Sequence, residues 1–294
     1  MAKQREVRPT EGPGDLHFAA IPAKAESISA GLRRFVPLSR RSPQAPGDAV
    51  ARAKLIVGNW KMNGTADELG EIAAMAAAGT DLPAHVTLAI CPPATLIDRA
   101  RTVATGRLVI GAQDVHAAGH GAFTGSVSVA MLDDAGARLV IVGHSERRAD
   151  HHETDADVRA KAEAVLAGGM TAIVCVGETA AERDAGTTLT VIGGQLDGSL
   201  PGSAVNLAVA YEPVWAIGSG LTPTLQQVGG VHAAIRTNLV ARYGDAGEAV
   251  AILYGGSVKP GNAAEILAID NVDGALVGGA SLTAAEFLGI VRAA

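Results

Sequence analysis

Residues 210–224 read AYEPVWAIGSGLTPT, and the rest of the chain is organised around this stretch. An apolar run, Asn206–Tyr211, leads straight into Glu212, so we expect a carboxylate where a buried strand ends. Pro213 stiffens the exit from the strand, and small residues follow it in a loop that could open and close. A carboxylate at a strand end before such a loop suits proton abstraction in a site that excludes water. A strand-capping glutamate before an ordinary glycine turn is the alternative interpretation.

From Lys54 onward, a strand-like run alternates with a helix-like run eight times. The strand-like runs are short, continuous and rich in Val and Ile, as expected for parallel strands buried on both faces. Eight such units predict a closed (β/α)8 barrel, and no GxGxxG motif follows the first strand to favour a doubly wound open sheet. The predicted strands are Lys54–Trp60, Val86–Cys91, Leu108–Asp114, Arg138–Gly143, Thr171–Gly177, Asn206–Tyr211, Val250–Tyr254 and Val272–Val277. The clearest predicted helices are Thr65–Ala78, Pro93–Val103, Thr154–Ala167 and Thr224–Tyr243, with Pro260 opening a later one.

The composition is that of a globular protein with an aliphatic core. Hydrophobic residues make up 48% of the chain and aromatic residues only 3%, so Ala, Val, Ile and Leu must fill the interior. A net charge of −6 argues against general nucleic-acid binding. No apolar run approaches the roughly 18 residues of a membrane span. Cys91 and Cys175 lie in apolar runs without metal-binding spacing, so we expect two buried thiols in a reducing compartment.

Residues 1–52 are predicted to form a disordered N-terminal extension, and residues 53–294 to form the barrel domain. Residues 1–50 mix Pro, Ser, Arg and Glu without sustained periodicity, and they carry a surplus of positive charge while the remainder is acidic. They lack the apolar run of a secretory signal, and their acidic residues argue against a mitochondrial presequence. We expect this extension to be dispensable for folding and activity.

Polar residues and glycines follow several of the predicted strands. In a (β/α)8 barrel the active site lies at the C-terminal ends of the strands, where these positions meet on one rim. The sequence therefore predicts a single polar site there. Its members are Asn59 and Lys61 after the first strand, His144 and Glu146 after the fourth, Glu212 after the sixth, Ser257 after the seventh, and Gly278 and Gly279 after the eighth.

Several motifs resemble those of the triosephosphate isomerase family and occur in that family's order. AYEPVWAIG resembles the flexible lid, and the other motifs are GNWKMNG (58–64), GAFTG (121–125), VGHSERR (142–148), CVGET (175–179), YGGSV (254–258) and VGGASL (277–282). The resemblance extends from about residue 53 to the C-terminus. It implies a cytoplasmic, cofactor-free and metal-free homodimer that interconverts glyceraldehyde 3-phosphate and dihydroxyacetone phosphate.

The resemblance also implies roles for the residues of the rim. Glu212 would move a proton between two carbons of the substrate, and His144 would polarise the carbonyl as a neutral imidazole. In this family a helix N-terminus lowers the pKa of that histidine. Lys61 would supply a fixed positive charge, with Asn59 orienting it and donating to a substrate oxygen. Glu146 is expected to hold Lys61 or His144 in position rather than to act as a second base.

Phosphate binding is assigned to backbone N–H groups. Gly218, Ser257, Gly278 and Gly279 would offer them, and a last helix beginning within residues 281–285 would add its dipole. Because many barrels bind phosphate after strands seven and eight, this feature predicts a phosphate ligand and not a particular reaction.

The loop at residues 115–127 is expected to brace a second subunit. Thr124 would reach the neighbouring copy's Asn59 and Lys61, so the resemblance implies a homodimer. Ser126 stands where an acidic residue is common, which predicts that Arg147 lacks its usual partner. The histidines are expected to face solvent, because no carboxylates accompany them at metal-ligand spacing: His116, His120, His151 and His152.

Two other functions stay open at this point. A related aldose–ketose isomerase acting on a four-carbon sugar phosphate would use the same acid–base residues in a roomier pocket. A catalytically idle barrel that serves as a binding protein is the other alternative. The presence of Glu212, His144 and Lys61 argues against the idle barrel.

Overall fold

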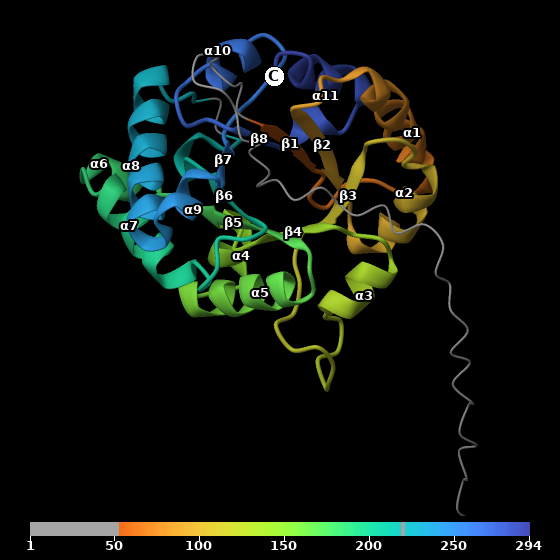
Figure 1. The fold of residues 1–294 in the computed structure, drawn as a ribbon, viewed down its shortest axis with the longest axis horizontal. Coiled ribbons are helices and arrows are strands. Elements are labelled where there is room, and N and C mark those ends of the chain that lie inside the picture. The colour runs from red at the N-terminus through yellow and green to blue at the C-terminus, as the bar shows by residue number, and fades with distance from the viewer. Residues whose placement is uncertain (1–52, 219–220) are drawn as a thin grey trace, which may run out of the picture. The chain divides into compact units, whose positions relative to one another are not determined.

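The computed structural model describes residues 53–218 and 221–294. The predicted extension, residues 1–52, lies outside the described residues. Parallel strands pair in chain order, and the last pairs with the first, which confirms the predicted closed barrel (Figure 1). The strands are β1 (Lys54–Asn59), β2 (Val86–Cys91), β3 (Val109–Ala112), β4 (Leu139–Val142), β5 (Thr171–Val176), β6 (Leu207–Tyr211), β7 (Ala251–Tyr254) and β8 (Gly274–Val277).

Helices surround this barrel and cover the outer faces of the strands (Figure 1). The α-helices are α1 (Leu69–Ala78), α2 (Ile97–Val103), α3 (Val129–Asp134), α4 (Ser145–Asp150), α5 (Asp155–Ala167), α6 (Ala180–Asp184), α7 (Thr188–Ser199), α8 (Leu225–Tyr243), α9 (Asp245–Glu248), α10 (Ala263–Leu267) and α11 (Ala284–Val291). The short 3-10 helices are η1 (Ala66–Glu68), η2 (Gly79–Asp81), η3 (Ala94–Leu96), η4 (Val214–Ala216) and η5 (Gly279–Ser281).

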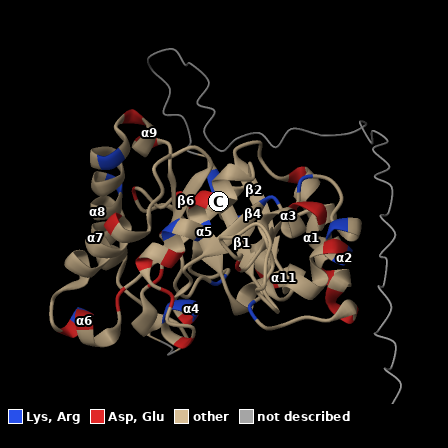
Figure 2. Ribbon diagram, turned by 90° about the horizontal axis from the view of Figure 1, so that it is seen from below, with Lys and Arg blue, Asp and Glu red and all other residues tan. Residues whose placement is uncertain are grey.

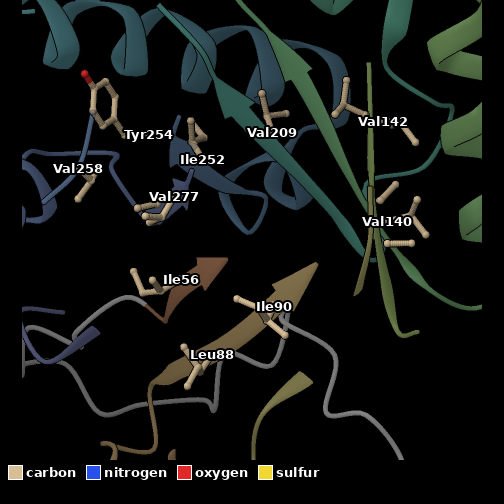
Figure 3. Packing of buried hydrophobic residues seen from close by; sticks show 14 of the residues in the cluster. Ile56, Leu88, Ile90, Val140, Val142, Val209, Ile252, Tyr254, Val258 and Val277 are labelled. Atoms are coloured by element: carbon tan, nitrogen blue, oxygen red, sulfur yellow. The ribbon is translucent and has the colours of Figure 1, made fainter. Parts of the chain in front are cut away.

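Alternation along the strands divides the core into two layers. Successive side chains of a strand point to opposite faces of the sheet, so Leu55 and Val57 of β1 point into the barrel while Ile56 points outward. Figure 3 shows outward-facing residues of several strands, including Ile56, Val140 and Val209, in the cluster between strands and helices. The barrel interior is filled by Leu55, Val57, Ala89, Cys91, Leu139, Ile141, Ile173, Cys175, Ala208, Ala210, Leu253 and Leu276. The lumen is therefore packed, and a substrate can reach only its open rim.

The structure corrects some predicted boundaries. The strand expected over Leu108–Asp114 forms only between Val109 and Ala112, because its register with β2 and β4 ends there. Thr154 is the N-cap residue of α5, and its hydroxyl accepts the amide of Asp157. Pro260 does not open the helix that follows β7, because α10 begins only at Ala263.

Many charged residues lie on the helices that surround the barrel (Figure 2). Figure 2 shows acidic and basic residues on outer helices, for example α2 and α6. Cys91 and Cys175 are both buried and free, which confirms the expected thiols. Within residues 53–218 and 221–294, no helix is long and apolar enough to cross a membrane.

Candidate active site

Glu212 lies at the mouth of the barrel and contacts His144. Ala208 and Ala210 of β6 point inward, and the same alternation directs Glu212, just past the strand, towards the lumen. Only 2% of Glu212 and 5% of His144 is exposed. Nε2 of His144 lies 2.7 Å from Oε1 of Glu212, and the amide of Ser145 donates to Oε2 at 2.9 Å. A base and a hydrogen-bonding imidazole are thus held together away from water.

These contacts set the protonation of the pair. Burial would raise the pKa of Glu212, but the imidazole of His144 and the amide of Ser145 outweigh it and bring that pKa below its ordinary value. Burial would lower the pKa of His144, but the carboxylate of Glu212 reverses this and brings that pKa above its ordinary value. The expected lowered pKa of His144 is therefore wrong for this arrangement, because the carboxylate in contact with the ring outweighs the effect of burial.

The start of α4 still selects one tautomer of the neutral His144 ring. His144 is the N-cap residue of α4, and its Nδ1 accepts the amide of Glu146 at 3.3 Å. A ring nitrogen that accepts a backbone amide carries no proton of its own. The neutral ring therefore carries its proton on Nε2, the atom that faces Glu212.

Lys61 joins the same cluster through Glu146. Its Nζ lies 2.6 Å from Oε1 of Glu146, while Oε2 of Glu146 lies 3.6 Å from Nδ1 of His144. Asn59 accepts the amide of Lys61 on its side-chain oxygen at 3.0 Å. The structure thus brings together Asn59, Lys61, His144, Glu146 and Glu212, from the ends of three strands.

Sequence reasoning missed the residue that holds the backbone of Lys61. Lys61 adopts a φ of 52°, a left-handed conformation that costs energy for any residue with a Cβ atom. Nε2 of Gln113, just after β3, donates to the carbonyl oxygens of Lys61 and Cys91, both at 2.9 Å. A polar side chain just after a strand was the available signal for Gln113, as it was for Asn59.

Of the four residues assigned to phosphate binding, Ser257 follows β7, Gly278 and Gly279 follow β8, and Gly218 follows β6. A Cβ atom added at Gly278 would lie 3.7 Å from Cε of Lys61, so this loop touches the charged cluster. Gly279 begins η5, and Ser257 is half-buried after β7, the strand that pairs with β8. A Cβ atom at Gly218 would meet no described atom within 4 Å, and Gly218 has a φ of 69°.

The last helix, α11, begins within residues 281–285 as expected, and a separate 3-10 helix precedes it. The 3-10 helix η5 begins earlier, at Gly279, and α11 begins at Ala284. The carboxylate of Glu71 accepts the amide of Ala284 at 2.6 Å, and Thr283 caps the same helix. The N-terminus of α11 is therefore occupied by protein groups, and the η5 turn lies nearer to Lys61.

A second carboxylate, Glu178, anchors the start of the predicted lid. It is fully buried just after β5, and its Oε1 accepts from the indole of Trp215 at 3.0 Å and from the hydroxyl of Tyr211 at 3.2 Å. Arg183 donates to the same oxygen at 3.0 Å, and its guanidinium carbon lies 4.5 Å from the centre of the Trp215 ring. Sequence reasoning quoted the CVGET motif but assigned Glu178 no role.

The loop expected to reach a second subunit projects from the barrel between β3 and α3 (Figure 1). Residues 119–126, which include Thr124, are all exposed. The prediction that Arg147 lacks a partner is wrong. Its guanidinium lies 2.9 Å from a carboxylate oxygen of Asp114 and 2.5 Å from one of Glu153. Two acids from elsewhere in the fold thus serve in place of one at Ser126.

A closed barrel with a buried Glu–His pair and a lysine at the C-terminal ends of its strands defines a (β/α)8-barrel enzyme. A family model described as "Triosephosphate isomerase" matches residues 54–294. The chain belongs to the triosephosphate isomerase family, as its motifs indicated, and the predicted fold and family are confirmed.

Known relatives agree with this assignment. The chain is 62% identical over 242 residues to a triosephosphate isomerase of Ruegeria sp. (strain TM1040), covering 82% of this chain and 97% of that protein. It is 60% identical over 242 residues to one from Afipia carboxidovorans, covering 81% of this chain and 96% of that protein. Among solved structures, triosephosphate isomerase from Bartonella henselae is 46% identical with a TM-score of 0.77, covering 82% of this chain and 98% of that one.

Proposed function

We propose that the protein interconverts D-glyceraldehyde 3-phosphate and dihydroxyacetone phosphate by proton transfer through an enediolate. Membership in the family supports the reaction. The observation that carries the mechanism is the 2.7 Å contact between the carboxylate of Glu212 and Nε2 of His144 at the barrel mouth. A buried base beside a hydrogen-bond donor suits proton removal next to a carbonyl group.

Glu212 acts as the base. Its lowered pKa keeps it ionised at neutral pH, so it is ready to accept a proton. It removes a proton from the carbon beside the carbonyl and returns that proton to the neighbouring carbon, while the substrate's hydroxyl proton moves to the former carbonyl oxygen. The carboxylate must leave Nε2 of His144 to do so, and the substrate's oxygen takes its place.

His144 and Lys61 stabilise the charge that develops on the substrate oxygens. Once the carboxylate leaves, burial is the largest remaining influence on the pKa of His144, and it lowers that pKa and favours the neutral ring. The Nε2–H of that ring then donates to the carbonyl oxygen, and Lys61 supplies a positive charge that needs no reorganisation. Asn59 donates to a substrate oxygen, and Glu146 holds Lys61 in place between turnovers.

The phosphate group is bound by backbone amides. We assign this role to Ser257, Gly278 and Gly279 beside Lys61, with Gly218 joining them when the lid closes. Glycine permits the close approach of backbone N–H groups to an anion. The placement of Gly278 against the Lys61 side chain supports this assignment.

A homodimer formed through the loop at residues 115–127 is part of the proposal, with Thr124 inserted next to the second copy's Asn59 and Lys61. Two exposed apolar side chains support it: Phe123, in this loop, is 45% exposed, and Met62, next to Lys61 in the sequence, is 96% exposed. Such side chains are commonly buried when a second copy binds. Size-exclusion chromatography with light scattering should give twice the mass of the chain.

We assign residues 53–294 to the isomerase domain and treat residues 1–52 as a dispensable extension. The family match over residues 54–294 supports this boundary. A variant that begins at residue 53 should fold and retain full activity. We place the reaction in the cytoplasm, where two buried, free cysteines stay reduced. The proposed chemistry uses only protein groups, so no cofactor is required.

The decisive experiment measures kcat/KM of the full-length protein for glyceraldehyde 3-phosphate and for a four-carbon aldose phosphate in parallel. The triose should be preferred, with kcat/KM approaching the diffusional ceiling of about 10⁸–10⁹ M⁻¹s⁻¹. A preference for the four-carbon substrate would transfer the assignment to a related isomerase. Activity towards neither would contradict the proposal.

A further inference from the structure

Trp60 stands between two residues of the proposed site but faces away from them. It follows Asn59 and precedes Lys61, and its side chain is buried in the cluster between strands and helices. Its indole Nε1–H donates to the carbonyl oxygen of Ser281 at 2.8 Å, across 221 residues of sequence. A buried indole N–H needs an acceptor, and here that acceptor is a backbone carbonyl of the loop that follows β8.

That bond reaches the turn after β8, residues 278–281, which we call the β8 turn. The amide and the hydroxyl of Ser281 both donate to the carbonyl oxygen of Gly278, at 2.8 and 2.7 Å. A Cβ atom at Gly58 would lie 2.7 Å from Cβ of Ser281, so Ser281 also packs directly on β1. Gly279 and Ala280 are the first residues of the 3-10 helix, so their backbone N–H groups have no acceptor within that helix.

Lys61 touches the same turn from the other side. A Cβ atom at Gly278 would lie 3.7 Å from Cε of Lys61. Lys61 is bonded to Trp60 through the backbone, and Trp60 is bonded to the β8 turn through its indole. Trp60 therefore links the backbone that carries Lys61 to the β8 turn.

We propose that Trp60 is a positioning residue that holds the β8 turn in register with Lys61 and thereby sets the affinity of the site for the phosphate group. This inference rests on the proposed function, which places the phosphate between these groups. Without the indole donor, the carbonyl of Ser281 loses a buried partner and the turn moves relative to Lys61. The base, Glu212, follows β6, which pairs with β5 and β7 and not with β1 or β8, so phosphate binding is affected and the base is not.

The test replaces Trp60 with phenylalanine, which keeps an apolar ring but has no donor. In W60F, KM for glyceraldehyde 3-phosphate and the inhibition constant of inorganic phosphate should each rise about tenfold, while kcat falls less than about threefold. With D-glyceraldehyde, which lacks the phosphate, kcat/KM should stay unchanged. Leu239→Ala in α8 is the control, because it removes buried packing without touching the β8 turn.

Ser281→Ala is the second variant and guards against a failure of W60F to fold. It removes the hydroxyl bond at the other end of the turn, and it should raise the same two constants about threefold. Equal losses with glyceraldehyde and its phosphate, or an unchanged inhibition constant, would overturn the inference. An inactive wild-type protein would overturn the proposed function instead. Calorimetric titration of inorganic phosphate into wild type and W60F would then still decide the role of Trp60.

Discussion

Gln113→Leu should weaken both the fold and the reaction, because Gln113 holds the strained backbone of Lys61. Its amide donates to the carbonyl oxygens of Lys61 and Cys91, both at 2.9 Å. Cys91 keeps a second donor, the amide of Trp60 at 3.1 Å, so the main loss falls on Lys61. With about 1 kcal/mol for each bond and a further cost for the unpaired carbonyl, stability should fall by about 2 kcal/mol.

For a domain of this size, that loss lowers Tm by about 4–8 °C at fixed protein concentration. Because the left-handed backbone of Lys61 can then relax, kcat/KM should also fall by about tenfold or more. Thermal unfolding and steady-state kinetics measure the two effects. Arg107→Leu is the matched control, since Arg107 donates to the carbonyls of Leu82 and Val86 at the opposite end of the barrel and should cost stability alone. A Gln113→Leu protein with Tm within about 1 °C and kcat/KM within about twofold of wild type would refute the reasoning.

Other predictions concern the lid anchor and the titrating groups. Glu178→Gln removes the charge that holds Trp215, so kcat/KM should fall about tenfold and the fluorescence of Trp215 should change. Burial lowers the pKa of His232 to about 4, so stability that is present above pH 6.5 should be lost as pH falls towards 4, by up to about 3 kcal/mol. In a His232→Gln variant, the free energy of unfolding measured with urea should change less with pH over this range. Glu212 has a lowered pKa, so its contribution is lost as pH falls below 4.5. The pKa of His144 is raised, so its contribution to stability is lost as pH rises above 6.5. The urea midpoint of Glu212→Gln should therefore differ most from that of wild type between pH 4.5 and 6.5.

The fold could be predicted from the sequence because a strand-like run followed by a helix-like run recurs eight times. Each strand such as Thr171–Val176 is a continuous apolar run, and every one of the eight predicted strands overlaps an observed one. The strand ends were less predictable, because hydrogen bonding to neighbours decides them, as at Val109–Ala112. Short helices such as α4 and α6 lack the length that gives a periodic pattern.

The sequence predicts those site residues that have a reactive side chain just after a strand. It does not predict contacts that form only in the folded chain. Glu212 and His144 follow strands and bear reactive groups, so their meeting could be expected. The partners of Arg147 could not, because Asp114 and Glu153 reach it only in the folded chain. The direction of the His144 pKa also depends on a contact, since the carboxylate of Glu212 reverses the effect of burial. The assigned roles of these residues stay predictions.

Hydrogen exchange at the substrate carbon tests the central claim, that Glu212 is the base, most directly. Dihydroxyacetone phosphate is incubated in deuterium oxide with wild type and with Glu212→Gln, and its C1 protons are followed by NMR. The amide of glutamine preserves the shape and the bond to the amide of Ser145 but cannot accept a carbon-bound proton. Wild type should incorporate deuterium rapidly, and Glu212→Gln should lose at least about a thousandfold in rate while remaining folded. Exchange by the variant at a rate close to that of wild type would contradict the account and assign the base to another residue.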